Sequence, residues 1–143
     1  MTRPPQIDWA HAKAPDLDAF ETLALAAYRA LPPEFLHFTG DVLIAIADFP
    51  EEEVIDEMEL ESEFDLLGLF QGTGLPHRGA MPETGHMPNR ILLYRRPILD
   101  FWAEHDETLG AIVTHVLIHE IGHHFGFSDA DMEAIERLAR DRD

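Results

Sequence analysis

The stretch HEIGHHFGFSD, residues 119–129, carries the strongest indication of both fold and chemistry. His119 and His123 are four residues apart, and in an α-helix such residues lie one above the other about 6 Å apart, so both imidazoles can face one metal ion. Glu120 follows His119 directly and points to the flank of that ion, where it can accept a proton from a metal-bound water without ligating the metal. The sequence therefore predicts a helical zinc site in which Glu120 is the general base.

The residues after His123 strengthen this prediction. The chain has nine histidines and 28 acidic residues, so an HExxH pentapeptide could arise by chance, whereas a match that also requires a glycine and a carboxylate is much rarer. Gly126 allows the chain to leave the helix in a left-handed turn that other residues adopt reluctantly. We expect this turn to bring Asp129 back toward the ion. Two histidines and one carboxylate leave the fourth position open to water, as in catalytic zinc sites.

Several of these roles have competing interpretations. Asp129 precedes an expected helix and could be only its N-terminal cap. Glu133 is the alternative third ligand, although it follows His123 closely. His115 lies one helical turn before the motif and is interpreted either as a surface histidine or as a hydrogen-bond donor to the ligands. Tyr94 and Arg95, which precede the motif, are the candidates for stabilising the transition state, and the sequence does not decide between them.

Composition limits the class of protein and its partners. The 143 residues suffice for a single domain, 1–143, with one core. The absence of cysteine restricts metal ligands to imidazole and carboxylate, and the net charge of −18 argues against nucleic acid as a partner. The first residues contain no apolar core of signal-peptide length, so we expect no signal peptide, and the longest aliphatic run, VLIAIA at 42–47, is too short to cross a membrane. We expect a soluble, cytoplasmic monomer that does not bind membranes.

The acidic residues are concentrated in one segment. Residues 48–65, DFPEEEVIDEMELESEFD, contain ten carboxylates and neither Lys nor Arg. We interpret this segment as a solvated helix face that keeps the protein soluble, and the alternative is a docking surface for a basic partner.

Hydrophobic periodicity predicts an α+β fold in which helices pack on a small sheet of about three strands. The predicted strands lie within 41–49, 66–72 and 89–96, and the first is expected to be covered on both faces. The predicted helices cover 16–31, a segment after Pro50 with Val54, Ile55 and Met58 on its inner side, a short segment after Pro97, 106–125 and 128–140. The connection between the second and third strands is rich in Gly and Pro, and its length indicates a functional or poorly ordered loop.

The motif and its surroundings resemble a known family. Residues 119–129 match the metzincin-type pattern HExxHxxGxxH/D with aspartate in the last place, and LLGLFQGTGLP (66–76) with PNRILLYRRPI (88–98) is similar to the small bacterial metallopeptidases called minimal zincins. The resemblance covers nearly the whole chain, most specifically 65–137. It implies a zincin-like fold with a shortened sheet and an active-site helix beneath it. It also implies Zn²⁺ ligation by His119, His123 and Asp129, with Glu120 as the catalytic acid and base.

The prediction that follows is a zinc-dependent metallopeptidase that hydrolyses a peptide or protein substrate. One departure from the larger metzincins weighs against robust proteolysis, because only 14 residues follow Asp129, where those enzymes have a subdomain with a methionine turn. The alternative is therefore a non-catalytic metal-binding or protein-interaction module that retains the zincin fold.

Overall fold

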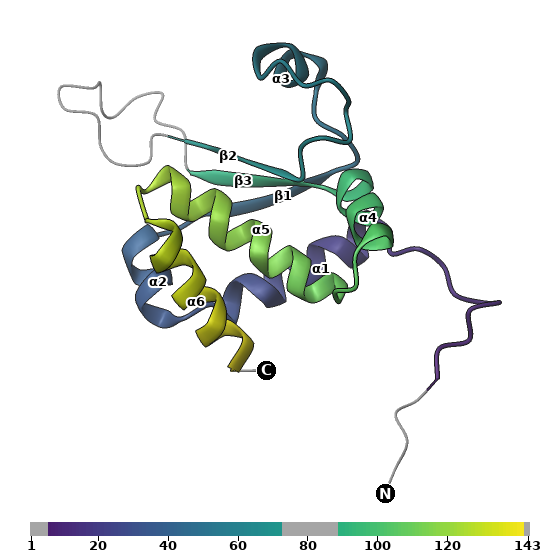
Figure 1. Cartoon of the computed structure of the whole chain (residues 1–143), viewed down its shortest axis with the longest axis horizontal. Coiled ribbons are helices and arrows are strands. Elements are labelled where there is room, and N and C mark those ends of the chain that lie inside the picture. Colours follow the sequence, from purple (N-terminus) through teal and green to yellow (C-terminus); the bar gives the residue numbers. More distant parts are fainter. Residues whose placement is uncertain (1–5, 73–88, 142–143) are drawn as a thin grey trace, which may run out of the picture.

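The computed structural model describes residues 6–72 and 89–141, which form six helices and one three-stranded sheet (Figure 1). The helices are α1 (Leu17–Arg29), α2 (Pro33–Thr39), α3 (Glu52–Glu57), α4 (Arg95–Glu104), α5 (Leu109–His124) and α6 (Asp129–Asp141). The strands are β1 (Leu43–Ala47), β2 (Gly68–Gln71) and β3 (Arg90–Tyr94). The α+β fold with a small sheet, predicted from the sequence, is confirmed.

The sheet has the order β1-β3-β2, with β1 parallel and β2 antiparallel to the central strand. In β3, Ile91 and Leu93 are fully buried, whereas Arg90 and Leu92 on the other face are only partly buried. The helices α1, α5 and α6 lie on the side of the sheet that carries the core (Figure 1). The expectation that β1 is covered on both faces was wrong, since its residues are half-buried or exposed.

Helix α5 is the centre of the domain. It begins at the cap residue Thr108, whose side chain accepts a hydrogen bond from the Ala111 amide at 3.1 Å. The helix lies between the sheet and α6, and it also packs against α1 (Figure 1). Its buried residues are Ile112, Val113, Val116, Leu117, Ile118, Ile121 and Gly122. Much of its circumference is therefore buried, and His115, His119 and His123 share one side of the surface that remains.

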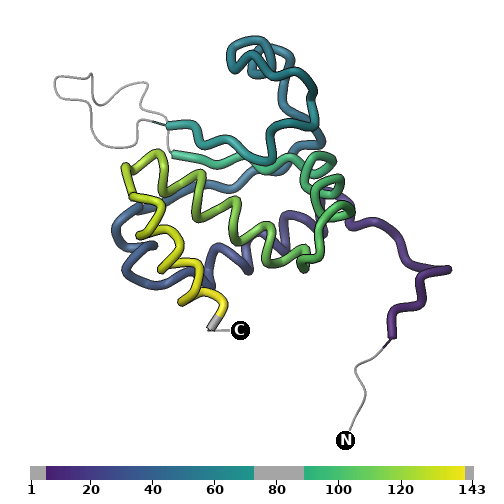
Figure 2. Tube along the Cα trace, in the orientation of Figure 1, coloured from purple at the N-terminus to yellow at the C-terminus, as the bar shows by residue number. Residues whose placement is uncertain are grey.

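The chain reverses direction after α5. Gly126 has a φ of +83°, its amide donates to the carbonyl of His123, and the amide of Phe127 donates to the carbonyl of Gly122. These two bonds form a Schellman motif, which satisfies the last carbonyls of the helix. As a result α6 runs back alongside α5 (Figure 2). The left-handed glycine expected at this position is confirmed.

The α5–α6 contact is close at one point. Met132 is fully buried, and a Cβ at Gly122 would lie 2.6 Å from its sulfur. Gly122 therefore provides the space into which Met132 packs, so Met132 has an ordinary packing role here.

Two helices differ from the expectation. The pair Pro32-Pro33 ends α1 as predicted, but Pro33 also occupies the first position of α2, where its missing amide costs nothing. Helix α3 extends away from the rest of the domain (Figure 1), none of its residues is buried, and Met58, expected on its inner side, is 45% exposed.

Two further expectations concern the connecting loop and the membrane. The Gly- and Pro-rich connection between β2 and β3 falls on 73–88, outside the described residues. Among the helices of the described part, none combines the length and the apolar character needed to cross a membrane.

The packing of Met132 on Gly122 predicts different effects for two glycines of α5. We expect Gly122→Ala to lower the free energy of unfolding by about 1–3 kcal/mol, because the added methyl group overpacks a filled contact. Gly110→Ala, where the methyl group meets nothing within 4 Å, should be neutral or stabilising by up to about 1 kcal/mol. Urea denaturation measures both, and equal effects at the two positions would contradict the close α5–α6 contact.

Candidate metal centre

Three histidines form a stripe along α5, namely His115, His119 and His123. The rings of His115 and His119 are stacked with their centroids 4.0 Å apart, and the rings of His119 and His123 meet edge to face at 6.0 Å. The four-residue spacing read from the sequence therefore does place these imidazoles in one row on the helix surface.

The carboxylate of Glu136, on α6, contacts the first two histidines of this stripe. Its Oε1 lies 3.0 Å from His115 Nδ1 and 2.9 Å from His119 Nε2. The ligand atoms of these three residues all lie within 4.8 Å of one another. Burial raises the pKa of Glu136, but the hydrogen bonds with His119 and His115 outweigh it, so the pKa is lower than usual. Two imidazoles and a carboxylate thus share a small volume that could hold a metal ion.

The third histidine lies near Asp129, across the turn that joins α5 to α6. His123 Nε2 is 3.8 Å from Asp129 Oδ1, and the two side chains are 59% and 91% exposed. Thus Gly126 does turn the chain so that this carboxylate faces the last histidine of the motif. The structure brings His123 and Asp129 together, and it brings His119 to Glu136.

Asp129 is not needed as the cap of α6. The hydroxyl of Ser128 accepts the amide of Asp131 at 3.1 Å, and the Asp131 carboxylate accepts the amide of Ser128 at 3.4 Å. This reciprocal pair is a capping box, with aspartate in place of the more usual glutamate. The side chain of Asp129 is therefore available for another role.

Glu120 is largely withdrawn from solvent beside the motif histidines. Burial raises its pKa, and the nearby His123 and His119 lower it by less than burial raises it. A carboxylate with a raised pKa holds a proton more readily than an exposed one, which suits a group that accepts a proton and then returns it.

The two candidates for transition-state stabilisation lie in different surroundings. The guanidinium of Arg95 donates to Asp48 at 2.7 Å and to the carbonyl of Pro15 at 2.9 Å, so it fixes the N-terminal segment to the sheet. Tyr94 is buried, and its pKa is raised chiefly by burial and also by Glu51 and Glu120, against the lowering effect of Arg90. Of the two candidates, Tyr94 is the one that interacts electrostatically with Glu120.

Glu136 was missed by the sequence analysis, which considered Glu133 instead. Glu133 is exposed, whereas Glu136 follows Met132 by one helical turn and precedes the buried Ala139 by three residues. A signal was present, because Glu136 is the charged member of an otherwise apolar stripe of α6. Its partner is set by the register of α6 on α5, which the sequence alone does not give.

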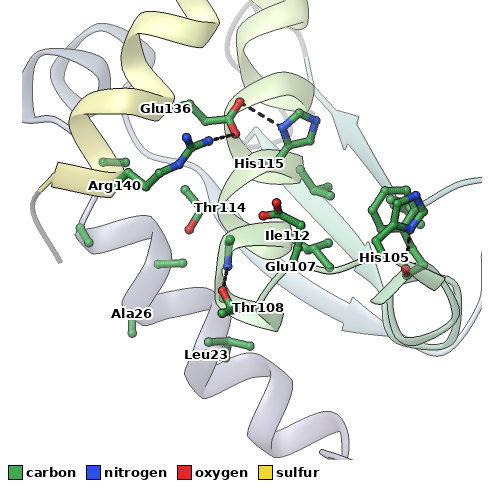
Figure 3. A pocket seen from close by; sticks show the side chains of 18 of the residues that line it. Leu23, Ala26, His105, Glu107, Thr108, Ile112, Thr114, His115, Glu136 and Arg140 are labelled. Carbon is green, nitrogen blue, oxygen red and sulfur yellow. Dashed lines mark hydrogen bonds and ion pairs between the residues drawn. The ribbon is translucent and has the colours of Figure 1, made fainter. Parts of the chain in front are cut away.

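A pocket of about 920 Å³ opens beside His115 and Glu136, which both line it (Figure 3). Its other walls come from α1, from the start of α5 and from the end of α4, including Leu23, Thr108 and His105. Glu120, His123 and Asp129 do not line this pocket. The upstream end of the histidine stripe therefore opens onto the pocket, and the motif end does not.

Comparison with known proteins identifies the family. The family model described as zincin-like metallopeptidase matches residues 39–138, which is more than half of the chain and includes all of HEIGHHFGFSD. The protein therefore belongs to the zincin-like metallopeptidase family. No curated protein matches the chain at a significant level. The donor set in the described residues suits the zinc ion that this family implies, since imidazole and carboxylate are both common zinc ligands.

The turn that presents Asp129 gives a second testable expectation. A Cβ at Gly126 would meet nothing within 4 Å, so any cost of replacing it is conformational. We expect Gly126→Ala to lower the free energy of unfolding by about 1–2 kcal/mol, and Gly126→Asn to lower it by less because asparagine tolerates the left-handed conformation. Urea denaturation of both variants tests this, and an alanine variant as stable as wild type would show that the turn is not under this constraint.

Proposed function

We propose that the protein is a zinc-dependent peptidase in which His119, His123 and Asp129 hold the ion and Glu120 is the general base. The observation that carries this proposal is the position of Glu120, withdrawn from solvent and next to both motif histidines, with a raised pKa. The turn at Gly126 supports it, because Asp129 faces His123 and is not used as a cap. Membership of the zincin-like family supports the same reaction class.

Each group of the proposed site has a separate role in peptide hydrolysis. His119, His123 and Asp129 would hold the zinc ion, which would supply a water acidified to near neutrality and would polarise the carbonyl under attack. Glu120 takes the proton of the attacking water and passes it to the leaving amine, so that one carboxylate serves as base and then as acid. Tyr94, buried and electrostatically coupled to Glu120, is our candidate for assisting this transfer.

The substrate is proposed to bind in extended form along β2. Within residues 6–72 and 89–141 this strand is at one edge of the sheet, where it pairs with β3, and it packs on α5. The rings of Phe70, on β2, and His124, on the motif helix, lie with their centroids 4.1 Å apart and their planes tilted by 33°, so the edge strand contacts this helix. An extended peptide can add to such an edge by main-chain hydrogen bonds.

The proposal predicts that Glu120→Gln removes catalysis without removing metal. We expect turnover of a peptide library to fall by roughly 10²- to 10⁴-fold, which is the usual contribution of a general base. The zinc content should stay at the wild-type value. The matched control is Glu34→Gln, which alters an exposed glutamate in the first turn of α2. If wild-type protein loaded with zinc cleaves nothing that the Glu120→Gln variant leaves intact, the peptidase proposal is wrong.

Zinc should also stabilise the native state. A ligand that binds only the folded protein adds about 4 kcal/mol when its free concentration is 1,000 times its Kd. We therefore expect chelation of the zinc-loaded protein to lower the melting temperature by several degrees. An unchanged melting curve, in protein whose zinc content has been shown to drop, would refute this coupling.

A non-catalytic metal-binding module is the alternative, and one observation favours it. Glu136 places a second carboxylate 2.9 Å from His119. If it joined the three motif ligands, a tetrahedral ion would have no position left for water. In that case wild type and Glu120→Gln would bind zinc equally and neither would cleave peptides, so the same experiment decides between the two functions.

A further inference from the structure

We infer a second divalent-metal position on the same helix stripe, one turn upstream of the motif. Its ligands are His115 Nδ1, His119 Nε2 and Glu136. It shares His119 with the proposed peptidase site but uses neither His123 nor Asp129, so it can be tested in a chain that lacks those two side chains.

The two distances from Glu136 to the imidazoles are close to those between the ligands of a metal site. Ligands at about 2.0–2.1 Å around a tetrahedral ion lie roughly 3.3 Å from one another. Glu136 Oε1 lies 3.0 Å from His115 Nδ1 and 2.9 Å from His119 Nε2, and one ligand atom of each residue lies within 4.8 Å of the other two. An ion placed between them would move the carboxylate slightly away from each imidazole and bring the two histidine nitrogens to the same spacing.

The surroundings hold the three side chains in place. Glu136 is 15% exposed and lies in the stripe of α6 that also contains Met132 and Ala139, both buried. The stacking of the two imidazoles limits how they can turn. Because the ligands are already ordered by packing, little conformational entropy is lost when they bind an ion.

The position is also accessible. His115 is 54% exposed, and both His115 and Glu136 line the 920 Å³ pocket, so an ion can enter from solvent and keep a water as fourth ligand (Figure 3). On its far side, Glu136 Oε2 lies 3.4 Å from Arg140, whose exposed side chain helps to orient the carboxylate. The charge of Arg140 opposes a cation, but it is screened by solvent.

The donor set indicates which ions this position would take. Two imidazoles and one carboxylate form a borderline ligand set that suits Zn²⁺ and its neighbours among the divalent transition metals, rather than Ca²⁺ or Mg²⁺, which prefer sites built of oxygen.

The test is zinc binding by a chain that lacks the motif position. In His123→Ala/Asp129→Ala, both altered side chains are exposed, so the fold should be kept, and circular dichroism checks this. We expect isothermal titration with zinc chloride to give one equivalent bound. Adding His115→Gln or Glu136→Gln to this background should weaken binding roughly tenfold or more, since even residues that only orient a ligand contribute that much.

Two matched controls make the result specific to the three ligands. His105→Gln alters another histidine that lines the same pocket, and Glu133→Gln alters an exposed glutamate on α6. Both should leave zinc binding in the double-variant background unchanged. If the double variant does not fold, the more conservative His123→Gln/Asp129→Asn serves as the background.

The inference is overturned if the background variant binds no zinc, or if it binds zinc with an affinity that neither His115→Gln nor Glu136→Gln changes. Because the readout is metal binding in a chain without the motif position, the result is independent of whether the protein cleaves peptides.

Discussion

The reversal of the chain at Gly126 is the constraint on which the candidate site depends. A left-handed residue at the end of α5 satisfies the last carbonyls of that helix and sends α6 back along the same helix surface. The reversal places one carboxylate at each end of the histidine stripe, Asp129 at the turn and Glu136 one helical turn after Met132. The turn is therefore what brings both of these α6 carboxylates to the histidines of α5.

Helix α5 contributes apolar side chains to the core and histidines to the candidate site, and the residues needed for packing restrict which positions can carry site residues. Its apolar residues contact the sheet, α1 and α6, and the histidine stripe lies on the part of its surface that these contacts leave open. Helices α5 and α6 approach each other so closely at Gly122 that even one methyl group there would meet the buried sulfur of Met132. The histidines are thus held by a rigid, buried helix, which is how functional side chains are kept in a fixed geometry.

Local patterns in the sequence predicted most of the helices and strands. The contacts between these elements, which determine the candidate site, could not be predicted in this way. The periodicity of α1, α5 and α6, the three strands and the glycine at the turn could all be read from the chain, because each depends on residues a few positions apart. Pro33 was read only as the end of one helix, although it also begins α2. Glu136 was missed for a different reason: its contacts, to His115 and His119, are 21 and 17 residues away and depend on how α6 packs on α5.

The two carboxylates differ in what binding a metal would require of them. Asp129 is 91% exposed and must be ordered, and its histidine partner is 3.8 Å away, so the motif position loses conformational entropy when it forms. Glu136 is already ordered by packing, but it is hydrogen-bonded to two imidazoles and to Arg140, so the upstream position must exchange these hydrogen bonds for bonds to the metal.

His119 belongs to both sets of ligands. Its Nε2 has a single lone pair, and an ion bound at the upstream position therefore removes that nitrogen from the motif position. In any one molecule His119 can therefore serve only one of the two positions. The fraction of molecules in which it is free of Glu136 limits the fraction that can form the three-ligand site needed for the peptidase reaction.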